Sequence, residues 1–251
     1  MSTTPRIITL ESVDSTNAYL RALPLDTPDF TVAAARCQTA GRGQRGNRWE
    51  SAPGENITLS MLFIPGAIPP AGQFAISRAV ALAAADLVAE CLPDDVRPQV
   101  AVKWPNDIYV ADRKIAGILI EHSLSGNAIS RTIIGIGLNV NQLHFVSDAP
   151  NPVSLAQLAG RTFDVDELTL RLCGLMQQRL EAERDSAGTL SADEYLSRLW
   201  RRDGFHPYRE AGSSDVFTAR IAAVSPMGFI ALERPDGTSS SYAFKEVFPI
   251  L

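Results

Sequence analysis

The residues best suited to chemistry lie between Gly41 and Trp49, in the run Gly-Arg-Gly-Gln-Arg-Gly-Asn-Arg-Trp. Glycine lets the backbone approach a ligand closely. Arginine offers a planar, permanently charged set of donors that suits phosphate and carboxylate. A loop that combines both is suited to enclosing an anion, although a solvated basic surface loop would have the same composition.

Three further segments carry polar residues in apolar surroundings: 103–108 (Lys-Trp-Pro-Asn-Asp-Ile), 114–121 and 135–141. A lysine on a mostly apolar strand is costly unless it meets an anion, so Lys103 is the first candidate for a catalytic residue. A structural salt bridge is the alternative for Lys103. Lys114 is a second candidate, but an exposed lysine on a strand explains it equally.

Composition narrows the class of protein. The chain has 251 residues, 45% of them hydrophobic, which suits one large domain or a large domain with a small one. A net charge of −5 disfavours a general nucleic-acid-binding role. The cysteines, Cys37, Cys91 and Cys173, are too widely spaced for a disulfide framework or a metal-binding pair. With no signal peptide and no run of membrane-spanning length, we expect a cytoplasmic protein without membrane contact.

Hydrophobic periodicity and turn residues predict the elements that must position these side chains. An α+β order is expected, with segregated elements and a mixed or mostly antiparallel sheet. Turn residues at 106–107 or 111–113 would return strand 114–121 beside strand 100–104. The other strands are expected at 6–13, 30–37, 57–64 and 132–140, and a buried helix at 73–91.

Capping residues and a change of character mark the remaining boundaries. Residues 14–17 offer helix caps, and capping boxes Asp164-x-x-Glu167 and Ser191-x-x-Glu194 open two later helices. After Gly204 the chain changes to short strands at 217–224, 228–233 and 240–247. These strands predict a small β-barrel at the C-terminus.

In this order and spacing, the motifs resemble those of the bacterial biotin protein ligases, also called biotin–acetyl-CoA-carboxylase ligases. The resemblance covers nearly the whole chain, from residues 14–17 through Gln38, the Gly/Arg loop and 103–107 to Lys114-x-x-Gly117 and Gly137-x-Asn139. It implies a class II synthetase-like, biotin–lipoate ligase-like catalytic domain over residues 1–203. An SH3-like barrel over residues 204–251 is implied as well.

The resemblance implies ATP-dependent biotinylation of one lysine of a carrier protein. In that reaction the biotin carboxylate attacks the α-phosphate of ATP, which gives biotinyl-5′-AMP and pyrophosphate. The carrier lysine then attacks the acyl carbon and releases AMP. The expected substrates are biotin and ATP with Mg²⁺, without a tightly bound metal, and the expected partner is the biotin carboxyl carrier protein of acetyl-CoA carboxylase.

Site residues are assigned by the same resemblance, and several keep a plainer interpretation. Ser15, Thr16 and Asn17 also suit helix caps, and Trp49 suits a packing anchor for the loop. Lys103, Arg42 and Arg45 are expected in catalysis, and Asp107 as a weak Mg²⁺ ligand. The biotin group is Ser15, Thr16, Asn17, Gln38, Gly41, Arg42, Lys103, Gly117 and Ile118; the ATP and adenylate group is Gly43, Arg45, Arg48, Trp49, Asn106, Lys114 and Asn139.

Two departures from the family pattern carry expectations of their own. Gln44 stands where the family commonly has a second arginine that helps to retain the adenylate, so faster adenylate release is expected. The first ligase-like strand begins at Arg6, so we expect no helix-turn-helix domain and no DNA partner. The resemblance leaves monomer and homodimer open.

Three rival functions remain. A lipoate or octanoate protein ligase would share the fold and the adenylate chemistry, but its Arg-Arg-x-Ser-Gly-Gly-Gly type run is absent. A non-catalytic biotin or nucleotide sensor would not need both Lys103 and Arg42. An interaction module built on the C-terminal barrel would leave the N-terminal motifs unexplained.

Overall fold

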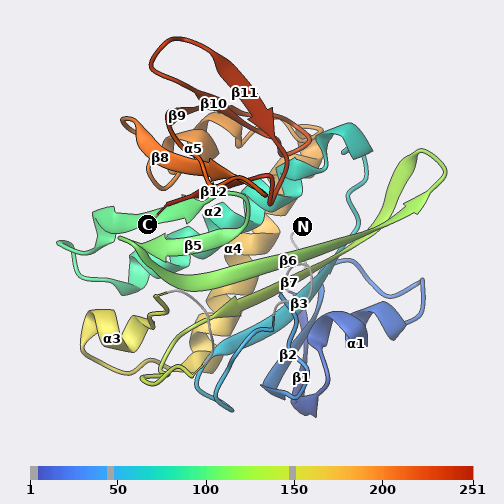
Figure 1. Ribbon diagram of the computed structural model, residues 1–251. Coiled ribbons are helices and arrows are strands. Elements are labelled where there is room, and N and C mark those ends of the chain that lie inside the picture. Colours follow the sequence, from blue (N-terminus) through green and yellow to red (C-terminus); the bar gives the residue numbers. More distant parts are fainter. Residues whose placement is uncertain (1–4, 44–47, 147–150, 251) are drawn as a thin grey trace.

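The computed structural model describes residues 5–43, 48–146 and 151–250. Within these ranges a seven-stranded mixed sheet forms the centre of the molecule, and a five-stranded antiparallel sheet follows near the C-terminus (Figure 1). Among the described residues, no helix has both the length and the apolar character that a membrane span requires.

The central sheet has the strand order β1-β2-β3-β7-β6-β5-β4. Strands β1 and β2 are parallel, and every other pair is antiparallel, which confirms the expected mixed sheet. The strands are β1 (Arg6–Val13), β2 (Thr31–Gln38), β3 (Ile57–Phe63), β4 (Val100–Lys103), β5 (Asp107–Val110), β6 (Arg113–Ser125) and β7 (Ala128–Leu138).

Helices cover both faces of this sheet. Helices α2 (Phe74–Cys91) and α4 (Val165–Asp185) pack on one face, and the fully buried alanines of α2 let its backbone lie close to its neighbours. Helix α1 (Thr16–Ala22) packs on the opposite face, because Leu62 of β3 joins Leu20 in a second core cluster. The shorter helices are α3 (Leu155–Ala159), α5 (Ala192–Ser197) and two 3-10 turns at Pro70–Gly72 and Arg97–Gln99.

The C-terminal sheet has the order β11-β10-β9-β8-β12, and its ladder of hydrogen bonds does not close between β11 and β12 in the described part of the chain. The sheet joins the central unit through Trp104, whose Nε1 donates to the Gly228 carbonyl at 3.0 Å. Its strands are β8 (His206–Glu210), β9 (Val216–Val224), β10 (Ile230–Glu233), β11 (Ser239–Tyr242) and β12 (Val247–Pro249).

Four local predictions were wrong. Turns form at 104–106 and at 111–112, and the four-residue strand β5 between them separates β4 from β6. The predicted strand at 240–247 is not one strand, because β11 ends at Tyr242 and β12 begins at Val247. Strand β8 was not predicted. Ser191 stands at the N-cap of α5 without a side-chain capping bond, because its hydroxyl accepts from Arg78 at 3.3 Å. The capping box that forms with both bonds is at Ser154.

Candidate functional site

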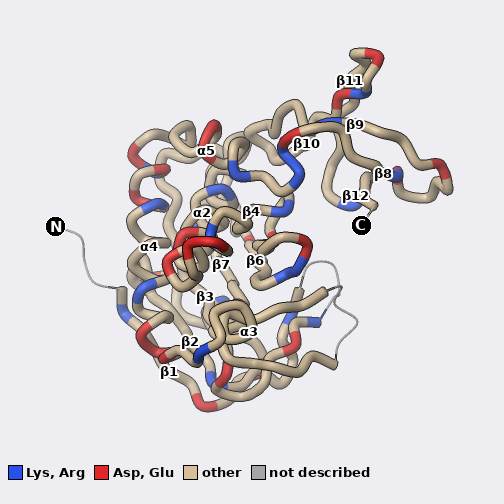
Figure 2. The backbone as a smooth tube through the Cα atoms, turned by 90° about the vertical axis from the view of Figure 1, so that its left-hand side faces the viewer, with Lys and Arg blue, Asp and Glu red and all other residues tan. Residues whose placement is uncertain are grey.

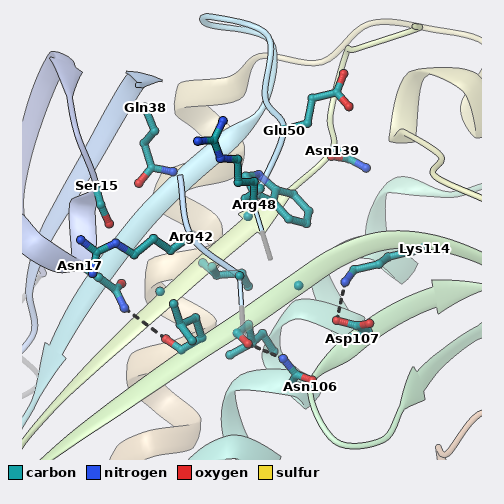
Figure 3. A pocket seen from close by; sticks show the side chains of 18 of the residues that line it. Ser15, Asn17, Gln38, Arg42, Arg48, Glu50, Asn106, Asp107, Lys114 and Asn139 are labelled. Carbon is teal, nitrogen blue, oxygen red and sulfur yellow. Dashed lines mark hydrogen bonds and ion pairs between the residues drawn. The ribbon is translucent and has the colours of Figure 1, made fainter. Parts of the chain in front are cut away.

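One cavity of about 560 Å³ gathers segments that are far apart in the sequence. Figure 3 shows Ser15, Asn17 and Gln38 at one end and Asp107 and Lys114 at the other. Its lining is Ser15, Thr16, Asn17, Gln38, Arg42, Gly43, Arg48, Trp49, Glu50, Leu59, Asn106, Asp107, Lys114, Gly117, Ile118, Leu119, Gly135, Ile136, Gly137, Asn139, Phe145, Pro152 and Phe244.

The parallel pairing of β1 with β2 builds the first end of the cavity. Val13 is in register with Gln38, so the turn into α1 emerges beside the end of β2. The Thr16 backbone N–H donates to Gln38 Oε1 at 2.9 Å. Ser15 is the N-cap residue by position, but its side chain makes no capping hydrogen bond. The Ser15 side chain lines the cavity, and its hydroxyl does not cap the helix.

Asn17 is held firmly from two sides. Its Nδ2 donates to Glu121 Oε2 at 2.9 Å, and its Oδ1 accepts from the hydroxyl of Ser60 at 2.5 Å. The side chain is only 4% exposed. The space it fills lies over Gly135, where an added Cβ would lie closer than 3.0 Å to the Asn17 amide oxygen. Glycine at position 135 is therefore required for this close approach.

Two glycines form the floor of the cavity. Gly117 on β6 and Gly137 on β7 are in register, and the indole of Trp49 lies over both. Trp49 Nε1 is buried without a hydrogen-bond partner in the described ranges. A buried donor without an acceptor costs free energy, so the packing of the ring on the two glycines is opposed by this N–H.

The Gly/Arg loop is fixed at its described ends. The Trp49 N–H donates to the Gly41 carbonyl at 3.1 Å, and Arg42 and Arg48 form an antiparallel bridge. Gly41 supports this pairing and does not itself line the cavity. Gln44 and the predicted catalytic residue Arg45 lie outside the described residues.

Opposite charges meet at the second end of the cavity. Lys114 Nζ lies 2.7 Å from Asp107 Oδ1, and both side chains are 23% exposed. Asn106 Nδ2 donates to the Ile118 carbonyl at 2.5 Å, which ties the turn before β5 to β6. Asn139 Nδ2 donates to the Val153 carbonyl at 3.0 Å. This end therefore offers a lysine held in place by a carboxylate.

Local charge distinguishes the cavity from the rest of the molecule. Its lining carries three basic side chains, Arg42, Arg48 and Lys114, and two acidic ones, Glu50 and Asp107, which leaves one net positive charge. The whole chain has a net charge of −5. Acidic and basic positions alternate along outer elements such as α4 (Figure 2). The lining is therefore suited to an anionic ligand.

Lys103 does not line this cavity, in contrast to its predicted place at the reacting groups. Its ammonium donates to the Tyr109 hydroxyl at 2.8 Å and lies 4.5 Å and 5.4 Å from the ring centres of Tyr109 and Trp200. Burial lowers the pKa of Lys103 below its usual value, opposed in part by Asp107. Because β5 intervenes, Lys103 lies on the outermost strand, while Lys114 on β6 reaches the cavity.

Most of the other predicted residues do line the cavity, and sequence reasoning missed several more. Leu59 and Leu119 belong to strands that were predicted, and Leu119 lies two residues after Gly117 and so on the same face of β6, which is a signal that could have found it. No sequence signal connects Phe244, in the turn between β11 and β12, with this site. Glu50, Phe145 and Pro152 were missed in the same way.

Comparison with known proteins gives a consistent result. Residues 9–139 match the biotin/lipoate A/B protein ligase family. The biotin--[acetyl-CoA-carboxylase] ligase of Paracoccus denitrificans is 33% identical over 71% of this chain and 74% of that protein. The bifunctional ligase/repressor BirA of Salmonella typhimurium is 32% identical over 79% of this chain, and the match spans 60% of the length of BirA.

A solved structure is also similar. The biotin protein ligase from Aquifex aeolicus, in complex with biotin and ATP, has a TM-score of 0.75 over 98% of both chains, at 22% identity. At this identity the likeness concerns the fold, and it covers both the central sheet and the C-terminal sheet.

Proposed function

Because the chain belongs to the biotin/lipoate A/B protein ligase family, we propose that it joins biotin to a lysine of a carrier protein in an ATP-dependent reaction. One observation carries the proposal. A single cavity brings the hydrogen-bonding groups of Thr16 and Gln38 together with the basic side chains of Arg42, Arg48 and Lys114. A long molecule with a polar ring and a carboxylate tail, such as biotin, matches that distribution.

The second end of the cavity, at Lys114, is where we propose that the adenylate forms. The biotin carboxylate attacks the α-phosphorus of ATP, a new O–P bond forms, and the bond to pyrophosphate breaks. Both reactants are anions, so cations must offset their repulsion. We propose that Lys114, with Arg42 and Arg48, does so, and that Asp107 holds the Lys114 ammonium in place. We assign this role to Lys114 rather than to Lys103, because the Lys103 ammonium is directed at Tyr109.

Asp107 also fits a Mg²⁺ ion that arrives with ATP. Mg²⁺ prefers oxygen ligands, and it is commonly held by one or two carboxylates together with substrate phosphates. No group of three or more His, Cys, Asp or Glu side chains that could by itself hold a metal ion occurs in the described part of the chain. A single carboxylate in a basic cavity therefore fits a metal that is held mainly by the nucleotide. When bound, the ion would withdraw charge from the phosphate oxygens.

The second step takes place at the same position in this proposal. A neutral lysine amine of the carrier attacks the acyl carbon of biotinyl-5′-AMP, an amide bond forms and AMP leaves. We propose the biotin carboxyl carrier protein of acetyl-CoA carboxylase as the carrier, in keeping with the name of the Paracoccus relative. An ATP-dependent reaction and three free cysteines fit a cytoplasmic protein.

We further propose the division of labour between the two parts of the chain. Residues 1–203 would bind biotin and ATP, and residues 204–251 would form an SH3-like unit. The antiparallel order of β8 to β12 supports that assignment. Trp49 and Asn139 would contact the adenine nucleotide, and Gly117 and Ile118 would lie against the biotin ring.

Biotin-dependent exchange between ATP and labelled pyrophosphate tests the proposal. We expect exchange with biotin and none with lipoate or octanoate. Exchange with lipoate or octanoate would instead make the protein a ligase for those acids. Tight biotin binding without exchange would make it a sensor.

The same assay separates the two lysines. We expect Lys114→Ala to lower exchange by about 100-fold, the usual effect of losing one preorganised charged group at a reacting centre. Lys103→Met is the matched variant and should retain most of the exchange. The reverse order of effects would restore Lys103 as the catalytic lysine.

A further inference from the structure

A row of polar groups runs beneath the first end of the cavity, from Glu121 on β6 to Gln38 on β2. It passes through Asn17, Ser60 and Thr16, with successive contacts of 2.9, 2.5, 2.7 and 3.1 Å. Ser60 is fully buried on β3, and neither Ser60 nor Glu121 lines the cavity. The direction in which these groups donate decides what the cavity offers to a ligand.

The Glu121 end sets the direction. An ionised carboxylate can only accept, and Glu121 also forms an ion pair with Arg21. Asn17 must therefore present its NH₂ to Glu121 and its carbonyl oxygen to Ser60. An amide turned the other way would place two oxygens against each other.

The hydroxyls of Ser60 and Thr16 share two short contacts, at 2.5 Å and 2.7 Å. Only one arrangement of their two protons places a proton in each of these contacts. Ser60 has a single proton, and the 2.5 Å contact to the Asn17 carbonyl oxygen requires it. The 2.7 Å contact between Ser60 and Thr16 must then contain the Thr16 proton. Thr16 Oγ1 is left with a lone pair for the cavity. Its 3.1 Å contact with Gln38 Oε1 is the longest of the row and therefore competes least for the Thr16 proton.

Gln38 is oriented by a backbone group. Its Oε1 accepts from the Thr16 N–H at 2.9 Å, so its NH₂ must lie on the other side of the amide. That NH₂ donates to no residue in the described ranges and lies at the cavity wall. The cavity end therefore presents an acceptor at Thr16 beside a donor at Gln38.

We infer that Glu121 and Ser60 are positioning residues, which fix Thr16 as an acceptor toward the ring of biotin, beside Gln38, which the Thr16 backbone N–H holds as a donor. The inference rests on the proposed function. The ureido group of biotin has one carbonyl oxygen that accepts and two N–H groups that donate, so it complements this pair. A ligand without a neighbouring donor and acceptor would leave one of the two unsatisfied, which gives the site its selectivity.

The first test removes the Ser60 hydroxyl, with a matched control on the same strand. Thr58 lies two residues earlier on β3, is also buried, and donates to the Ala35 carbonyl at 2.6 Å. Both Ser60→Ala and Thr58→Val remove one buried hydroxyl and lower stability. We expect only Ser60→Ala to raise the Kd for biotin, by about tenfold, the worth of one well-made hydrogen bond. The KM for ATP should stay unchanged in both variants.

The second test keeps an ion pair but reverses the row. In the charge swap Arg21→Glu with Glu121→Lys, an ammonium that can only donate would face Asn17. Thermal stability should stay near that of the parent protein, while the Kd for biotin rises by about tenfold or more. Arg21→Ala alone leaves the Glu121 carboxylate facing Asn17 and should keep the parent Kd.

Each outcome is decisive. If the parent protein binds biotin and either Ser60→Ala or the charge swap binds it equally well, the inference is wrong. If Thr58→Val weakens biotin binding as much as Ser60→Ala does, the effect is one of stability and the inference is also wrong. A parent protein that does not bind biotin at all would refute the proposed function instead.

Discussion

Replacing Gly137 by alanine probes the contact between Trp49 and the floor of the cavity. An added Cβ would lie 2.6 Å from Cζ2 of the indole, and closer still to Cε2 and Nε1. Ordinary contact begins at 3.4 Å, so the ring must retreat from the sheet by about 1 Å. Gly117, its partner across the ladder, is the matched control, because its Cβ would lie 3.2 Å from Trp49 Cζ3.

The expected cost of Gly137→Ala follows from this geometry. A gap of that size forfeits a quarter to a half of the dispersion energy between the ring and the floor. Overpacking of this kind destabilises by about 1–3 kcal/mol, or roughly 2–12 °C in Tm for a chain of this size. Gly117→Ala needs a shift of only a few tenths of an ångström and should cost less than about 1 kcal/mol.

Thermal unfolding and the KM values of the exchange reaction measure both effects. The displaced ring moves into the cavity, so we expect Gly137→Ala to raise the KM for biotin or ATP by about tenfold. In the Trp49→Ala background the cost of Gly137→Ala should vanish, with a coupling energy of at least about 1 kcal/mol. An equal cost in both backgrounds would refute the packing of Trp49 on Gly137.

Three other predictions concern different parts of the chain. Gly174→Ala, at an exposed helical position of α4 with no atom near the new Cβ, should stabilise by about 0.5–1 kcal/mol, and a lower Tm in thermal unfolding would contradict this. Burial lowers the pKa of His122 below its usual 6.5, so below that pH the unfolded chain binds a proton that the native state does not. Stability should fall as the pH drops, and His122→Gln should reduce the slope of Tm against pH. From the sequence alone, Gln44→Arg should lengthen the half-life of the enzyme-bound adenylate in a release assay, and an unchanged half-life would remove the idea.

The long strands and the buried helix could be predicted because burial leaves a plain pattern. Residues 57–63 are all apolar or small, and the structure buries every one of them in β3. Alanine-rich α2 begins and ends within one residue of the predicted range. In these elements local composition and tertiary packing favour the same structure.

Short elements and tertiary contacts could not be predicted in the same way. Asp107 is a residue type that favours turns, yet it is the first residue of β5, because its pairing with β4 and β6 outweighs that local preference. With this strand in place, Lys103 lies on the outermost strand of the sheet, and Lys114 on β6 lines the cavity. Ser191 matches a capping box, but its hydroxyl accepts from Arg78, a partner more than a hundred residues away. Phe244 reaches the cavity only through the packing of the second sheet.

The contribution of Phe244 to the cavity wall bears on how this chain can be divided. Its ring meets Trp104 edge-on with ring centres 6.2 Å apart, and Trp104 opens the turn that contains Asn106 and leads to Asp107. A fragment that ends before the C-terminal sheet would lose part of the wall and the carbonyl that Trp104 binds. The C-terminal sheet is therefore not an exchangeable module. Substitutions at Trp104 are expected to co-vary with substitutions at the residues it contacts in the C-terminal part of the chain, Gly228 and Phe244.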